Sequence, residues 1–172
     1  MTTEPAAPKL GQNDPDVIVR GYKFALKPTT SQEQKLRQHT GGSRFAYNYF
    51  ISQWRDDIHT RIKEKERGVP DDELTPFAFK LSTYDMINYW NRTKRECAPW
   101  WSEVSKEISN DAAHRAHDSI KNWLNSKSGK RKGRRVGFPR FHKRRYHESC
   151  TFWAEPLRVN PCLLYTSDAA DE

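Results

Sequence analysis

A basic stretch at residues 127–145 constrains this chain more than any other feature of its sequence. Serine and glycine residues separate its first cations, which predicts a flexible loop. In its stiffer second half, Val136, Phe138 and Phe141 alternate with polar residues around Pro139. Lysine and arginine neutralise phosphates and release counterions, while aromatic rings and guanidinium planes stack on bases. The pattern favours a nucleic-acid ligand over the alternative, a solvated loop whose two phenylalanines lie in a core.

The composition limits the classes of protein that the chain can belong to. Its 172 residues suffice for one ordinary domain or two small ones. A hydrophobic content of 35% and a mean hydropathy of -1.01 predict a thin core that depends on aromatic residues, six tryptophans among them. The net charge of +8 favours nucleic acid or an anionic membrane as partner. No run is apolar enough to span a bilayer and no signal peptide is visible, so we expect no membrane partner.

Three isolated cysteines, Cys97, Cys150 and Cys162, form no C-x-x-C pair. They provide neither a zinc site nor a disulfide framework, and they fit a reducing compartment. His114 and His117 lie three residues apart, but no second pair of ligands accompanies them. We therefore expect no metal and no cofactor in this chain.

Residue patterns divide the chain into five segments. They are a disordered N-terminus (1–16), a first strand (17–30), a helical region (31–125), a basic loop with returning strands (126–160, including a strand at 149–154) and a tail (161–172). Strands that flank a helical middle predict an α+β fold, a small sheet with a helical insertion. The tail resembles the translated adapter DNA found on environmental open reading frames, so we expect it to be non-native and the chain to be a fragment.

The first helical residues predict a helix-turn-helix-like arrangement. A capping-box pattern at residues 31–34 predicts the start of a short helix, and the Gly41–Gly42 pair predicts its end. Ser43 then predicts the cap of a second helix over residues 43–62, in which apolar residues recur at helical spacing. Two helices joined by a short turn are typical of DNA-binding helix-turn-helix proteins, although most helical hairpins bind no DNA.

Two further helices follow in the sequence. Ser82 predicts the cap of one, which Pro99 ends, and Ser109 predicts the cap of the last. Between them, Trp100 and Trp101 predict a hydrophobic corner. Alanines on one face of the last helix predict close packing against another helix.

Five pieces of the sequence carry a resemblance to a known family: residues 22–29, 32–36, 42–48, 99–105 and 132–143. The most specific combination is Arg-Phe-x-Tyr-Asn in the third piece with Val-Gly-Phe-Pro-Arg-Phe in the fifth. In order and rough spacing the pieces resemble the N-terminal part of the TnpB (OrfB) proteins of insertion sequences.

This resemblance implies a transposon-encoded, RNA-guided DNA endonuclease with a Mg²⁺-dependent RuvC-type centre. It implies that the expected strands belong to an incomplete oligonucleotide-binding-like β-barrel interrupted by a helical recognition insertion. The implied partners are a guide RNA and a double-stranded DNA target, in the prokaryotic cytoplasm at the nucleoid, with base pairing reading the target. The family's Mg²⁺-binding carboxylates lie downstream of the residues present here, so we expect this chain by itself to cut nothing.

The resemblance and the charge pattern together give candidate binding residues. Tyr84, Lys106 and Asn110 fall in the stretch where family members approach a short DNA motif beside the target, and lysine or asparagine can reach base edges. Arg44 and Asn48 are expected instead to fix the helix junction. The candidate contacts to the RNA or DNA backbone are the basic residues Lys130, Arg131, Lys132, Arg134, Arg135, Arg140, Lys143, Arg144 and Arg145.

Two other functions also fit the sequence. One is a free-standing helix-turn-helix DNA-binding protein in which the helix at residues 43–62 reads base edges. The other is a basic RNA-scaffolding protein with no switchable activity.

Overall fold

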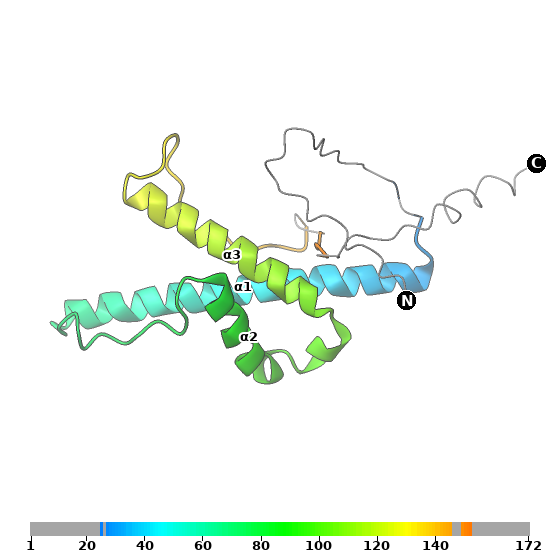
Figure 1. Cartoon of the computed structure of the whole chain (residues 1–172), viewed down its shortest axis with the longest axis horizontal. Helices are drawn as coiled ribbons and strands as arrows, with labels where there is room; N and C mark the ends of the chain where they lie inside the picture. Colours follow the sequence, from blue (N-terminus) through cyan, green and yellow to red (C-terminus); the bar gives the residue numbers. More distant parts are fainter. Residues whose placement is uncertain (1–24, 26, 146–148, 153–172) are drawn as a thin grey trace, which may run out of the picture.

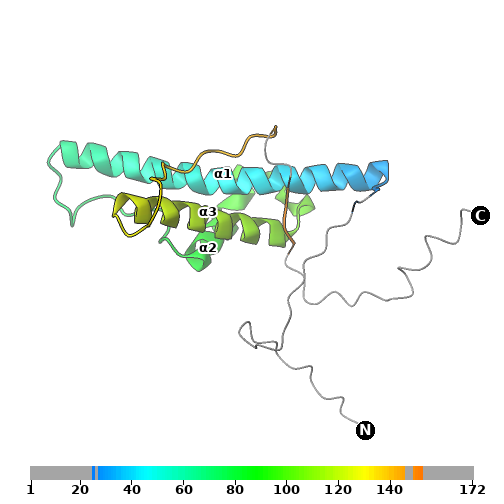
Figure 2. The same cartoon turned by 90° about the horizontal axis from the view of Figure 1, so that it is seen from above.

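Three α-helices and one short 3-10 helix form the described part of the chain (Figure 1). The computed structural model describes residues 25, 27–145 and 149–152. Its helices are α1 (Thr30–Glu66), α2 (Thr83–Cys97), η1 (Pro99–Glu103, 3-10) and α3 (Lys106–Lys127). The 37-residue α1 extends beyond the other helices at both ends, while α3 and α2 pack along its middle (Figure 2).

The start of α1 is fixed by a capping box, but not by the residues predicted for it. Thr29 is the N-cap: its Oγ1 accepts a hydrogen bond from the Gln32 amide at 3.4 Å, and its own amide donates to Gln32 Oε1 at 2.9 Å. These two bonds satisfy donors that a helix start otherwise leaves unpaired. The structure therefore has a capping box, but at residues 29–32, two residues earlier than the predicted 31–34.

The predicted break at Gly41–Gly42 is wrong, because α1 continues through both glycines. A Cβ atom on Gly42 would lie 3.0 Å from Val104 Cγ1 and 3.4 Å from Trp101 Cη2. A glycine inside a helix costs about 1 kcal/mol relative to alanine. Here it allows η1 and the residue after it to pack directly on the backbone of α1, and that tertiary contact offsets the local preference.

Ser43 is consequently not a helix cap. It lies inside α1, is 1% exposed, and its Oγ accepts a hydrogen bond from Arg115 Nη2 of α3 at 2.6 Å. Ser82 is the N-cap of α2 as predicted. The cap of α3 is Ser105, whose Oγ accepts from the Glu107 amide at 3.3 Å, rather than Ser109, which is buried inside the helix.

Aromatic and small side chains build the core between the helices. Phe50 of α1 and Trp90 of α2 are fully buried, and the Trp90 and Trp101 rings meet edge to face with centroids 4.6 Å apart. The predicted hydrophobic corner is confirmed for Trp101, which is 5% exposed, whereas Trp100 is 41% exposed. The buried alanines Ala112, Ala113 and Ala116 of α3 confirm the close packing predicted for the last helix.

The predicted α+β class is wrong, since the described residues contain no strand and therefore no sheet or barrel. Residues 25 and 27–29 are irregular, and so are residues 149–152, where a returning strand was expected. The remainder of the expected strands, the N-terminal segment 1–16 and the tail 161–172 lie outside the described residues.

Candidate nucleic-acid interface

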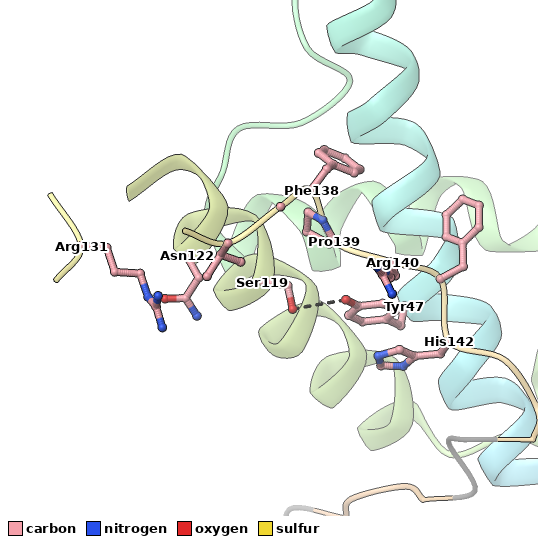
Figure 3. A pocket seen from close by; sticks show the side chains of 11 residues that line it. Tyr47, Ser119, Asn122, Arg131, Phe138, Pro139, Arg140 and His142 are labelled. Carbon is pink, nitrogen blue, oxygen red and sulfur yellow. Dashed lines mark hydrogen bonds between the residues drawn. The ribbon is translucent and has the colours of Figure 1, made fainter. Parts of the chain in front are cut away.

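The second half of the basic stretch, residues 136–145, crosses α1 and α3 as an extended segment that we call the strap (Figure 3). Asn48 of α1 holds its centre. The Asn48 Nδ2 donates to the His142 carbonyl at 3.0 Å, and the His142 amide donates to Asn48 Oδ1 at 2.7 Å. The Tyr47 and His142 rings stack with centroids 3.7 Å apart and planes 4° apart. One asparagine thus pairs with the strap backbone as a neighbouring strand would.

Three further contacts orient the strap. The Phe138 ring meets Trp123 of α3 edge to face at 5.1 Å, and the Val136 amide donates to Ser126 Oγ at 2.8 Å. The Arg55 guanidinium lies 4.7 Å from the centroid of the Phe141 ring. The apolar side chains of the strap therefore pack on the helices, and its cations are left facing solvent.

The first half of the basic stretch, residues 128–135, forms the basic loop that follows α3 (Figure 1). Gly129 and Gly133 have φ angles of 74° and 101°, a region that side-chain-bearing residues rarely adopt. Arg131 ties the loop together, because its amide donates to the Asn125 carbonyl at 3.2 Å and its Nη1 donates to the Arg134 carbonyl at 2.8 Å.

All nine predicted basic residues are solvent-exposed and lie on this one continuous segment. Five belong to the basic loop and four to the strap: Lys130, Arg131, Lys132, Arg134 and Arg135, then Arg140, Lys143, Arg144 and Arg145. Within the part of the chain that the structure describes, no carboxylate lies within ion-pair distance of any of them. Their charge is therefore not neutralised by those residues and is available to an anionic ligand.

The three predicted base-contacting residues lie elsewhere. Tyr84, 74% exposed, lies in the first turn of α2. Lys106 and Asn110 are four residues apart at the start of α3 and so share a face of that helix. The 22 residues of α3 span roughly 33 Å, which separates this pair from the basic loop at the other end. Lys106 lines a separate cleft of about 420 Å³ together with Lys94 and Arg95.

A cleft of about 480 Å³ lies between α3 and the strap. Tyr47 and Ser119 form its floor, where the Tyr47 hydroxyl donates to Ser119 Oγ at 3.2 Å, drawn as a dashed line in Figure 3. Asn122 of α3 and Arg131 of the basic loop also line the cleft, and Figure 3 draws both toward the end away from His142. The strap supplies the opposite wall, residues 136–142.

The ionisable groups with shifted pKa values lie outside the basic loop and strap. Burial raises the pKa of the Asp57 carboxyl and that of the Cys97 thiol. Hydrogen bonds from Thr75 lower the pKa of Glu64, near the C-terminal end of α1. Among the described residues, no group of three histidine, cysteine or acidic side chains could hold a metal ion.

Sequence reasoning missed Tyr47 and His142 and gave Asn48 a different role. Asn48 was expected to fix a helix junction, but it fixes the strap. A usable signal was present, because Tyr47 and Asn48 end one of the two specific motifs and His142 directly follows the other. Asn48, the last residue of the first motif, therefore contacts His142, which follows the second motif and lies 94 positions later.

The comparisons with known proteins agree with the motif resemblance. Residues 18–63 match a family described as a helix-turn-helix domain of the OrfB/IS605 type. The chain is 31% identical over 152 residues to two proteins of Mycobacterium tuberculosis, from strains CDC 1551 and H37Rv, each described as a "Putative RNA-guided DNA endonuclease". The alignments cover 83% of this chain and 31% of each relative, so the chain spans about a third of their length. No solved structure matches it significantly.

The described part of α1 within the family match is a single helix, so the family description does not correspond to a turn at Gly41–Gly42. No helix in the described part of the chain is both long and apolar enough to cross a membrane.

Proposed function

Because the chain is a TnpB/OrfB-type protein over its aligned region, we propose that it is a nucleic-acid-binding lobe of a transposon-encoded, RNA-guided DNA endonuclease. In this proposal it binds guide RNA and target DNA in the prokaryotic cytoplasm. The observation that carries the proposal is the row of nine exposed cations on the basic loop and strap, held on the helices by Asn48 and His142.

The geometry supports backbone binding in particular. A polynucleotide presents closely spaced phosphates, and each cation that neutralises one releases counterions. The strap is anchored at Val136, Phe138 and His142 before any ligand arrives. Binding therefore costs less conformational entropy, because the strap has already lost part of its freedom on folding.

We assign base recognition to Tyr84, Lys106 and Asn110, as contacts to a short DNA motif beside the target. The exposed ring of Tyr84 offers a stacking face, and Lys106 and Asn110 offer a donor and a donor–acceptor pair from one helix face. This assignment places shape and backbone recognition on the strap and motif recognition some distance away, while base pairing to the guide reads the target.

We further propose that this chain binds without cleaving. Mg²⁺-dependent phosphodiester hydrolysis needs carboxylates gathered around the metal. The described residues do not fit such a centre, since they contain no suitable group of three ligands.

The test is the salt dependence of binding. Replacing Arg134, Arg135, Arg144 and Arg145 with glutamine should weaken binding to RNA and DNA of any sequence. It should lower the slope of log K against log salt by about 0.7–0.9 for each phosphate that the variant no longer neutralises. A charge-matched control replaces four exposed cations outside the basic loop and strap, Lys63, Arg67, Lys80 and Arg92, with glutamine. Equal slopes for the two variants would remove the proposed role of the strap.

A further inference from the structure

The cleft between α3 and the strap combines a flat, largely apolar wall with a polar end. The wall consists of Pro139 and of His142, whose ring is stacked on Tyr47 at the floor of the cleft. The ring of Phe138 is fixed by its edge-to-face contact with Trp123, and the ring of His142 by its stack on Tyr47. The wall is therefore formed before any ligand binds.

The polar end has groups suited to both parts of a nucleotide, an amide for the base edge and guanidinium groups for the phosphate. Asn122 is exposed, and its amide has both donors and an acceptor, which can pair with the edge of a base. Arg131 also lines the cleft, with one N–H already donated to the Arg134 carbonyl, a bond that orients the guanidinium. Arg140 lines the same cleft. Guanidinium groups bind phosphate through paired N–H donors.

The size of the cleft also fits. About 480 Å³ lies within the range of roughly 300–1,000 Å³ typical of small-ligand sites, and it is too small to admit a duplex. A base inside a continuous duplex is stacked on both sides and paired, so its faces and edge are not available to such a cleft. A base in a single strand or a bulge has both available.

We infer that this cleft binds one unpaired nucleotide of RNA or DNA. Its base lies against the wall at Pro139, Asn122 contacts the base edge, and Arg131 binds the adjoining phosphate. The inference rests on the proposed function and deepens it. The strap cations bind any backbone, whereas the cleft selects strands that carry an unpaired base.

A substitution at Gly137 can block the cleft without disturbing the fold. Gly137 lines the cleft, its φ lies outside the left-handed region, and a Cβ atom there would meet no atom of the protein within 4 Å. Gly137→Leu should therefore fold normally and place a bulky side chain at the cleft. Asn122→Ala removes the amide without adding bulk, and Asn91→Ala on α2 removes an exposed amide outside the cleft as the matched control.

The experiment measures the affinity of the whole chain by fluorescence anisotropy at low salt. The ligands are single-stranded RNA and DNA of roughly 12 nucleotides and a blunt duplex of the same length. Asn122→Ala and Gly137→Leu should each weaken single-strand binding about tenfold and leave duplex binding within about twofold, with an unchanged salt slope. Asn91→Ala should change neither. The nucleic acid whose affinity falls more in the two cleft variants, single-stranded RNA or single-stranded DNA, is the one that the cleft prefers.

The outcomes separate the two proposals. If both cleft variants weaken single strands and duplex equally, or neither, the cleft inference is wrong while the strap can still account for binding. If the wild-type chain binds no polynucleotide at low salt, the proposed function fails and the inference fails with it.

Discussion

Replacement of Asn48 by alanine tests whether the strap depends on one side chain. The substitution removes both hydrogen bonds between Asn48 and the His142 backbone, at 3.0 and 2.7 Å, in a partly buried position. The stack of Tyr47 on His142 and the contact of Phe138 with Trp123 remain. The variant should therefore loosen the strap around His142 and leave the helices folded.

The size of the effect follows from the two hydrogen bonds that the substitution removes. Each contributes about 0.5–1.5 kcal/mol net, and a buried backbone group left without a partner costs about 1–3 kcal/mol. Since solvent can reach this partly buried site after the substitution, we expect the free energy of local strap opening to fall by about 2 kcal/mol. A change of that size corresponds to a roughly thirtyfold faster opening-limited amide exchange.

Hydrogen exchange followed by mass spectrometry measures this directly on peptides from residues 136–145. Protection in α1 and α3 should be unchanged, because the strap adds little to the core formed by Phe50, Trp90 and the alanines of α3. Asn48→Asp keeps an acceptor for the His142 amide but places an oxygen against its carbonyl, so its effect should be intermediate. Unchanged strap exchange in Asn48→Ala, or an equal loss of protection in all three helices, would refute the argument.

Two further predictions concern α1. Gly41→Ala should raise the free energy of unfolding in urea by about 0.5–1 kcal/mol, because a Cβ atom there meets only the tip of Arg44 at 3.8 Å. Gly42→Ala should lower it by about 1 kcal/mol, because its Cβ atom crowds Val104. Equal shifts in the two variants would contradict the packing role of Gly42. The hydrogen bonds from Thr75 lower the pKa of Glu64 below its ordinary 4.5, so their contribution is complete above pH 4.5 and is lost as the pH falls through the lowered value. The protection factor of the Thr75 amide, which corrects the exchange rate for its intrinsic pH dependence, should fall on that acidification, and a protection factor that does not change with pH would exclude the linkage.

The sequence predicted the helices well where periodicity reports burial, and poorly where only a local preference was available. Phe50 and the alanines of α3 recur at helical spacing and are buried as expected. Gly41 and Gly42 have the lowest helix preference apart from proline, and local rules end a helix there. The rule fails because Val104 and Trp101, about sixty residues later in the chain, occupy the space that a side chain on Gly42 would need. No pattern near residue 42 contains that information.

The strap shows why an alternating pattern does not by itself define a strand. Alternation of apolar and polar residues shows that an extended segment has one buried face, but not what buries it. Val136 and Phe138 are half-buried, and the strap packs on α1 and α3, with Asn48 taking the place of a strand neighbour at His142. The exposure of the nine predicted cations was easier to predict than the fold, because cations so close together have no neutral arrangement in a core and must be exposed wherever the chain places them.

The contact between the first specific motif and the residue that follows the second gives the sequence pattern a physical basis. A basic segment that was only required to attract phosphates could hang freely from α3, and its cations would attract a polynucleotide over a Debye length in any conformation. Tyr47, Asn48 and His142 instead fix the strap backbone on α1. Such anchoring matters for a surface that must match the fixed spacing of a strand and leave a cleft of defined shape beside it. In our proposal, charge accounts for the attraction of a polynucleotide, and the anchoring of the strap accounts for the choice of which strand is bound.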